Sequence, residues 1–106
     1  MKEDVRIECW GSTLIAHLAC ELDHHRARPV RERIDEELFC LRPKLLVFDF
    51  SGVPFMDSSG IALILGRAKG CTHIGASLRI EGLSSELYRL LGLSGIEGMP
   101  NVTIMK

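Results

Sequence analysis

The segment KLLVFDF, residues 44–50, limits what this chain of 106 residues can fold into more than any other segment. Its nearly continuous apolar character is typical of a central strand that is buried on both sides. Gly52 and Pro54 break the strand soon after it ends. Such a strand needs neighbouring strands and packed helices, so the segment predicts a single α/β domain.

Two further strands are expected before this central strand. Residues 5–10 alternate between apolar and polar side chains, as in a half-buried strand, and residues 13–20 are apolar on both faces except at His17. Gly11 and Ser12 leave room only for a tight turn between them. A short turn joins antiparallel neighbours, so the chain is predicted to begin with a hairpin and not with a strand–helix–strand unit.

Helices and strands alternate in the rest of the chain. The first helix begins near Arg26 and is ended by Pro43. Its buried stripe is expected at apolar residues three and four apart, namely Val30, Ile34, Leu38 and Leu41. A later helix at residues 85–92 has Ser84 as its cap, and strands are expected at residues 76–82 and 102–105.

The helix between these regions covers residues 58–69. Gly70 is expected just beyond its end in the left-handed conformation, with Arg67 and Lys69 in the last turn. The whole chain then has the order β-β-α-β-α-β-α-β. Strands joined through helices lie parallel, so this order predicts a mixed sheet, packed with α-helices, in which the first strand is antiparallel and the rest are largely parallel.

Composition narrows the classes of partner. Lys and Arg number 13 against 14 Asp and Glu, for a net charge of −1, so nothing favours nucleic acid or an anionic membrane surface. The apolar runs are well short of the roughly 18 residues that span a bilayer. The polar start MKED predicts no signal peptide. A cytoplasmic protein is expected.

Neither the cysteines nor the histidines have the spacing of a metal site. The cysteines, expected to be buried free thiols, are Cys9, Cys20, Cys40 and Cys71. The histidines, expected at the surface or at a docking site, are His17, His24, His25 and His73. No metal ion and no cofactor is therefore predicted.

The segment MDSSG, residues 56–60, stands at the start of the second helix. Asp57 is expected to be the N-cap, accepting hydrogen bonds from the backbone of Ser59 or Gly60, and Ser58 occupies the first helical position. Gly60 removes a side chain where another molecule could approach closely. These residue types fit a plain capping sequence as well as a site that meets phosphate at a helix N-terminus.

Three segments together resemble a known family. CELDHHRA (20–27), FMDSSGIALILGRAKG (55–70) and LSGI (93–96) are similar to the anti-sigma factor antagonists of the STAS domain family, and most of all to the anti-sigma-F factor antagonists of spore-forming bacteria. The likeness runs in register from the first hairpin to the last strand. The first two segments at this separation make a strong joint signal.

The resemblance implies a partner-switching protein that is not an enzyme. The unphosphorylated form would bind an anti-sigma factor, a serine kinase, and so free the sigma factor. The kinase would phosphorylate Ser58 and thereby release the antagonist, which a PP2C-type phosphatase would reset. By the same match the residues that bind the partner are Asp23, His24, Met56, Asp57, Ser59, Gly60 and Ile61. No direct contact with nucleic acid or membrane is implied, and a monomer is expected.

The chain departs from the family's usual pattern at several positions. Cys20 stands where glycine is usual, Arg26 where threonine is common, and Ala62 where glycine is common. A methyl group at Ala62, on the exposed side of the helix, would bring bulk toward a docked partner. Family members also usually carry a helix after the last strand, which has no counterpart before Lys106.

Two other functions remain open at this stage. Asp49, late in the central strand, resembles the acceptor of aspartate-dependent phosphatases, but their second aspartate is replaced by Ser51. The Gly-x-Ser-x-Gly motif of serine hydrolases is also missing around Ser58, so a hydrolase is disfavoured and Asp49 is expected to be a satisfied polar residue. The third reading keeps the STAS fold but makes it a sensor that binds a small molecule or nucleotide.

Overall fold

The computed structural model describes residues 4–105 and contains one five-stranded sheet. The strands are β1 (Val5–Trp10), β2 (Thr13–Leu18), β3 (Leu45–Asp49), β4 (Ser77–Glu81) and β5 (Val102–Ile104). The helices are α1 (Ala27–Leu41), α2 (Ser58–His73) and α3 (Ser85–Gly92), followed by a short 3₁₀ turn at Ile96–Gly98. The strands lie in the order β1-β2-β3-β4-β5, with β1 antiparallel to β2 and every other pair parallel. The predicted mixed sheet and element order are confirmed.

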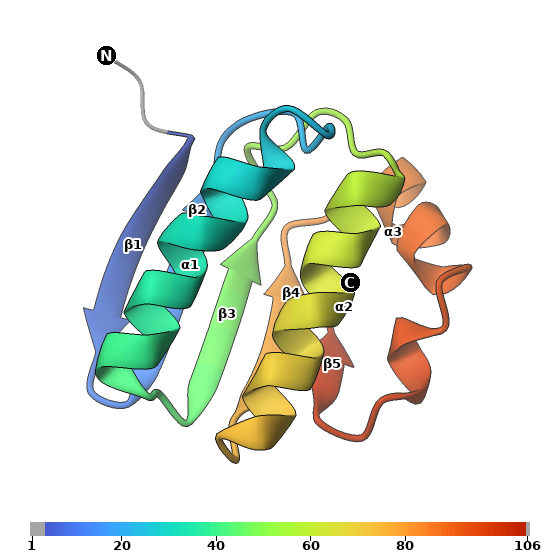
Figure 1. The fold of residues 1–106 in the computed structure, drawn as a ribbon. Coiled ribbons are helices and arrows are strands. Elements are labelled where there is room, and N and C mark those ends of the chain that lie inside the picture. Colours follow the sequence, from blue (N-terminus) through green and yellow to red (C-terminus); the bar gives the residue numbers. More distant parts are fainter. Residues whose placement is uncertain (1–3, 106) are drawn as a thin grey trace.

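Helices α1 and α2 lie side by side over one face of the sheet, and α3 lies beyond α2, near β5 (Figure 1). Strand residues that point toward α1 and α2 form the core with them, among them Leu46 and Phe48, which are fully buried. Val47 points to the opposite face, yet is only 1% exposed. Leu45 and Asp49 share that face and are half-buried. The two-sided burial predicted for this strand therefore holds at its middle, at Val47, and only in part at Leu45 and Asp49.

The first helix matches its predicted stripe except at the end. Val30, Ile34 and Leu38 are buried, whereas Leu41 is 48% exposed, contrary to the prediction. Leu41 is the last helical residue, and Arg42 after it adopts a left-handed conformation with φ 42°. The helix therefore ends at Leu41 and the chain turns directly after it, so Leu41 lies at the end of the stripe and is only partly covered.

The second helix is longer than predicted, so the assignment of Gly70 as its terminator is wrong. The helix continues to His73, which replaces Arg67 and Lys69 as the basic residue of the last turn. Cys71 is fully buried and extends the apolar stripe by one more turn. Packing of this turn outweighs the local tendency of Gly70 to end the helix, and Gly75 takes the left-handed conformation instead, with φ 71°.

The four cysteines divide into two pairs. Cys20 and Cys71 are buried as predicted, and burial raises the pKa of each thiol to about 11. Cys9 and Cys40 are exposed, so the prediction of buried thiols is wrong for them. Cys9 lies near the end of the edge strand β1, and Cys40 lies on the solvent side of the last turn of α1.

No helix within residues 4–105 combines the length and apolarity needed to cross a membrane.

Candidate functional site

The start of α2 is built around Asp57. Its backbone is extended, and its Oδ1 accepts a hydrogen bond from the Ser59 N–H at 2.8 Å, which confirms the predicted N-cap. Its carbonyl oxygen accepts from the N–H groups of Gly60 and Ile61 at 3.1 and 3.3 Å. Ser58 is therefore the first helical residue and is exposed. Within residues 4–105 its hydroxyl has no hydrogen-bond partner, so it is accessible to a reactant.

The connection before α2 is joined to the connection before α1. The Leu22 N–H donates to the Phe55 carbonyl at 3.0 Å, and the Asp57 N–H donates to the Leu22 carbonyl at 3.3 Å. These bonds form a parallel bridge between Leu22 and Met56. Both connections lie at the same end of the sheet, where β3 ends (Figure 1). The two sequence motifs, which are far apart in the sequence, are thus brought together as the resemblance implied.

Two residues expected at the docking surface are buried instead. Met56 is 2% exposed, and Gly60 is also buried. A Cβ atom at Gly60 would collide with the Met56 side chain and lie 3.0 Å from the Leu22 Cβ. Packing within the chain therefore already requires glycine at position 60. Met56 and Gly60 pack beneath the start of α2 and so fix its position.

Asp23 and His24 have different environments. Asp23 Oδ1 accepts from the backbone N–H groups of His25 and Arg26, both at 3.0 Å. The bond from Arg26, helped by the one from His25, lowers the pKa of the Asp23 carboxyl. Since Arg26, the residue before α1, offers no side-chain cap, Asp23 is what fixes this turn. His24 is exposed, with its ring centroid 4.0 Å from that of His25.

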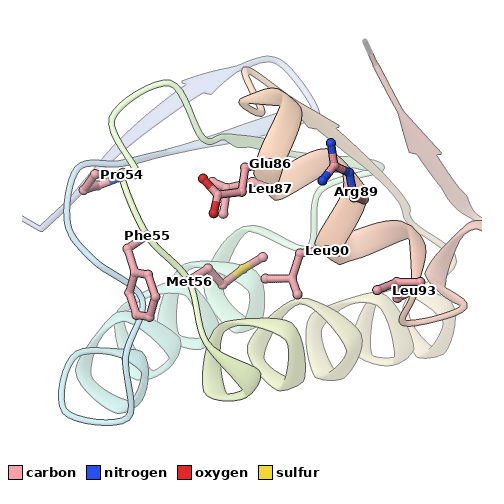
Figure 2. Close-up of a pocket in the computed structure, with 8 residues that line it drawn as sticks. All are labelled: Pro54, Phe55, Met56, Glu86, Leu87, Arg89, Leu90 and Leu93. Carbon is pink, nitrogen blue, oxygen red and sulfur yellow. The ribbon is translucent and has the colours of Figure 1, made fainter.

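A groove beside the site was not foreseen from the sequence. Residues 54–56 of the connection form one side, and side chains of α3 with Leu93 form the other (Figure 2). Phe55 and Leu93 are 50% and 82% exposed. Both residues lie in motifs that carry the resemblance, but only the position of α3 makes them walls of one groove. That position depends on tertiary packing, which local sequence patterns do not reveal.

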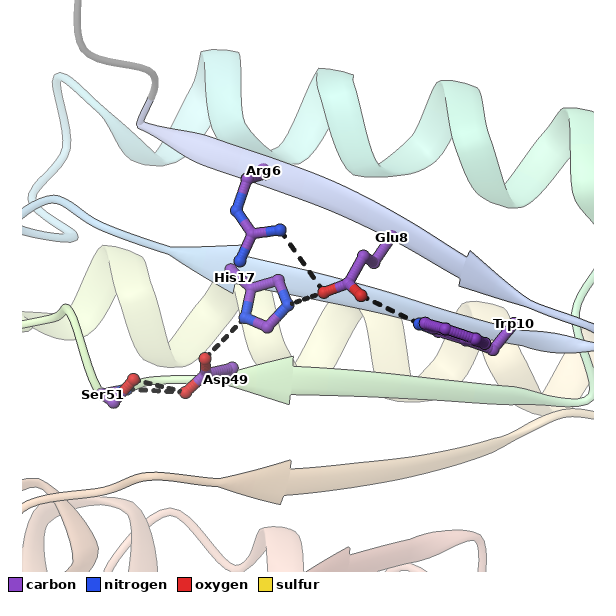
Figure 3. A network of polar contacts seen from close by, with 6 residues as sticks. All are labelled: Arg6, Glu8, Trp10, His17, Asp49 and Ser51. Atoms are coloured by element: carbon purple, nitrogen blue, oxygen red, sulfur yellow. Dashed lines mark hydrogen bonds and ion pairs between the residues drawn. The ribbon is translucent and has the colours of Figure 1, made fainter.

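Asp49 belongs to a separate network on the face of the sheet opposite α1 and α2 (Figure 3). Its Oδ1 accepts from the Ser51 N–H and hydroxyl at 3.0 and 2.7 Å, and its Oδ2 lies 2.6 Å from His17 Nδ1. The other ring nitrogen of His17 lies 2.6 Å from Glu8 Oε1, and Trp10 Nε1 donates to Glu8 Oε2 at 2.9 Å. Asp49 is thus a satisfied polar residue, as predicted.

The network favours a charged imidazole. The bond to Asp49, and less strongly the bond to Glu8, raises the pKa of His17 against the effect of burial. Burial would raise the pKa of Asp49, but the bonds from Ser51 and His17 together lower it. The Ser51 hydroxyl donates to a carboxylate and not to a histidine. The nucleophile–base pair that a serine hydrolase needs is therefore not formed by these residues.

Comparison with known proteins gives a consistent family. Residues 4–104 match the STAS domain. The chain is 33% identical over 96 residues to the "Anti-sigma F factor antagonist" of Paenibacillus polymyxa, covering 91% of this chain and 82% of the relative.

Two solved structures share the fold. The anti-sigma factor antagonist SpoIIAA in its unphosphorylated form superposes with a TM-score of 0.75 at 23% identity, over 96% of this chain and 87% of that one. The Bacillus cell fate determinant SpoIIAA in the phosphorylated form gives 0.74 at 25% identity, over 96% and 91%. The chain therefore belongs to the STAS domain family, among relatives that are anti-sigma factor antagonists.

Proposed function

We propose that this protein is an anti-sigma factor antagonist that is switched by phosphorylation of Ser58. In the unphosphorylated state it binds an anti-sigma factor that is also a serine kinase, and so releases the sigma factor. The kinase then transfers phosphate to Ser58, and a PP2C-type phosphatase removes it. The observation that carries the proposal is the exposed Ser58 hydroxyl at the first position of α2, which bonds to no other described residue and lies next to the turn that holds Asp23 and His24.

The docking surface that we propose consists of side chains that reach solvent around Ser58. They are His24, Phe55, Asp57, Ser59 and Ile61, which are exposed or half-buried. Asp23 sets the shape of the adjacent turn, and Met56 and Gly60 set the position of the α2 start. The buried residues thus hold the contact surface in place, and the surface itself offers both polar and apolar side chains, as a specific interface does.

The switch that we propose is electrostatic and not conformational. Phosphoserine carries about −1.5 to −2 charges at pH 7. At a helix N-terminus the dipole tolerates such a charge, with a stabilisation of about 0.3–1 kcal/mol, so the fold is retained.

Phosphate on Ser58 is expected to weaken binding to the partner although it leaves the fold intact. The new charge would stand next to the Asp57 carboxylate and close to the half-buried apolar Ile61. A partner that fits the neutral hydroxyl would then meet repulsion and a desolvation cost. A loss of about 3 kcal/mol weakens binding more than a hundredfold.

The test is to incubate the protein with ATP and its cognate anti-sigma factor kinase and to locate phosphate by mass spectrometry. We expect one phosphate, on Ser58. Ser58→Ala should remain unmodified and stay bound to the kinase, Ser58→Asp should bind poorly, and the neighbouring Ser59→Ala should still be modified. Phosphate on Ser59 in the unaltered protein, or continued modification of Ser58→Ala, would contradict the proposal.

We also propose that the protein works as a cytoplasmic monomer without catalysing a reaction itself. Its relatives are regulators, and the polar groups most suited to catalysis, His17 and Asp49, are occupied with each other. Sedimentation at micromolar concentration should give the mass of one chain. Hydrolysis of a small phosphate ester that depends on Asp49 would overturn this view.

A further inference from the structure

A second groove lies between α1 and α2 and begins beside the docking surface. Its floor is formed by Ser59, Ala62 and Gly66, which lie three and four residues apart on one side of α2. All three side chains are small, so a hollow of about 400 Å³ remains between the helices. An added Cβ at Gly66 would meet nothing within 4 Å, so the hollow is open there.

The sides of this groove are basic. Arg28 and Arg31 come from α1 and Arg67 from α2, and His24 stands at the end near Ser59. Two acidic residues offset part of this charge, because Glu32 pairs with Arg28 at 3.1 Å and Asp35 pairs with Arg67 Nε at 3.0 Å.

Two groups in the groove remain unmatched. Among the described residues no acidic side chain pairs with Arg31, and Arg67 Nη1 is buried without a hydrogen-bond partner. Burial lowers the pKa of the Arg67 guanidinium; Asp35 opposes this effect, and the charge of nearby Arg31 adds to it. Arg31 and Arg67 therefore line the same groove, and of the two only Arg67 has a carboxylate partner among the described residues. An anionic group beside the exposed Arg31 would relieve this repulsion and accept the N–H donors of that guanidinium.

We propose that this arginine groove receives an acidic segment of the anti-sigma factor, an inference that rests on the proposed function. A kinase must bring the phosphate that it transfers to within about 3–3.5 Å of the Ser58 hydroxyl. Its surface therefore covers the adjacent Ser59, which is also the floor of the groove. Carboxylates on that surface complement Arg31, which is exposed in the groove, because guanidinium forks bind carboxylates in a bidentate manner. The groove thereby selects the partner by charge.

The test is charge reversal with a matched control on the same helix. Arg31→Glu reverses a charge in the groove, whereas Arg33→Glu reverses one outside it. Each new glutamate faces an acidic residue four positions on, Asp35 or Glu37, and Arg33→Glu in addition breaks the ion pair between Arg33 and Glu37. Affinity for the kinase and the rate of Ser58 phosphorylation are measured at low and high salt, after circular dichroism has shown that both variants are folded.

We expect Arg31→Glu to weaken binding at least about tenfold at low salt, with a smaller loss at high salt. Arg33→Glu should change binding by less than about threefold. Gly66→Leu, which fills the groove without altering charge, should also weaken binding.

If wild-type protein is phosphorylated on Ser58 but both charge-reversal variants bind the kinase as tightly as wild type does, the groove is not an interface and only this inference fails. If wild-type protein neither binds the kinase nor accepts phosphate, the proposed function fails and the inference falls with it.

Discussion

Polar side chains cluster both at the start of α2 and on the open face of the sheet, which is the face opposite α1 and α2. The two clusters differ in whether their side chains bond to each other. On the open face, His17 is held between two carboxylates, and each of these accepts a further bond. At the start of α2, Asp57 is bonded to the backbone while the Ser58 hydroxyl beside it is not. Polar groups that bond to each other across the sheet join its strands, whereas an exposed hydroxyl that bonds only to water is available to a partner. The second region is where regulation is expected.

The packing beneath the start of α2 should be disturbed most by a substitution at Gly60. Gly60→Ala places a methyl group against Met56 and Leu22, and overpacking of this kind costs about 1–3 kcal/mol of the free energy of unfolding. Thermal and urea unfolding measure the loss.

Gly66→Ala is the control for this substitution. It lies on the same helix and meets open space, so it should stabilise the protein by about 0.5–1 kcal/mol through helix propensity. Equal effects at both positions would mean that Gly60 does not support the site by packing.

The cap is expected to matter less. Asp57→Ala removes the acceptor of the Ser59 N–H and should lower the free energy of unfolding by about 1 kcal/mol. Asp57→Asn keeps an acceptor oxygen and should lose only a fraction of this. If asparagine is as harmful as alanine, the charge of Asp57, and not its role as a cap, is what stabilises the α2 start.

The network on the open face should give the smallest effect, below about 1 kcal/mol, because its side chains are partly exposed. The raised pKa of His17 means that its stabilisation is complete below the unfolded value of about 6.5 and is lost as pH rises through the folded value. The lowered pKa of Asp49 gives the reverse on the acid side, where stability falls as pH drops. Urea unfolding from pH 5 to pH 9 should show a decline that His17→Gln removes, and an unchanged decline in this variant would contradict the assignment.

Local sequence patterns were sufficient for some features of both regions. The Asp57 cap and the place of Ser58 at the first helical position depend on residues that are close in sequence, and both predictions are confirmed. The burial of Met56 and Gly60 depends on the bridge to Leu22, which no local pattern reveals. The network from Glu8 to Asp49 likewise exists only because β1, β2 and β3 pair in one register.

The end of α2 also shows that local sequence patterns can be overridden by tertiary packing. Gly70 carries a strong local signal for a helix end, and the buried Cys71 overrides it through packing. The fold class was therefore predictable from the order of elements, whereas the support of the site and the grooves beside it were not.

The most direct test of the central claim is to compare unmodified and Ser58-phosphorylated protein in two measurements on the same samples. Titration against the anti-sigma factor kinase should show affinity reduced more than about a hundredfold by the phosphate. Urea unfolding should show free energies that agree within about 0.5 kcal/mol. Equal affinities, or a loss of affinity accompanied by a loss of several kcal/mol in stability, would contradict a switch that acts by charge at the surface.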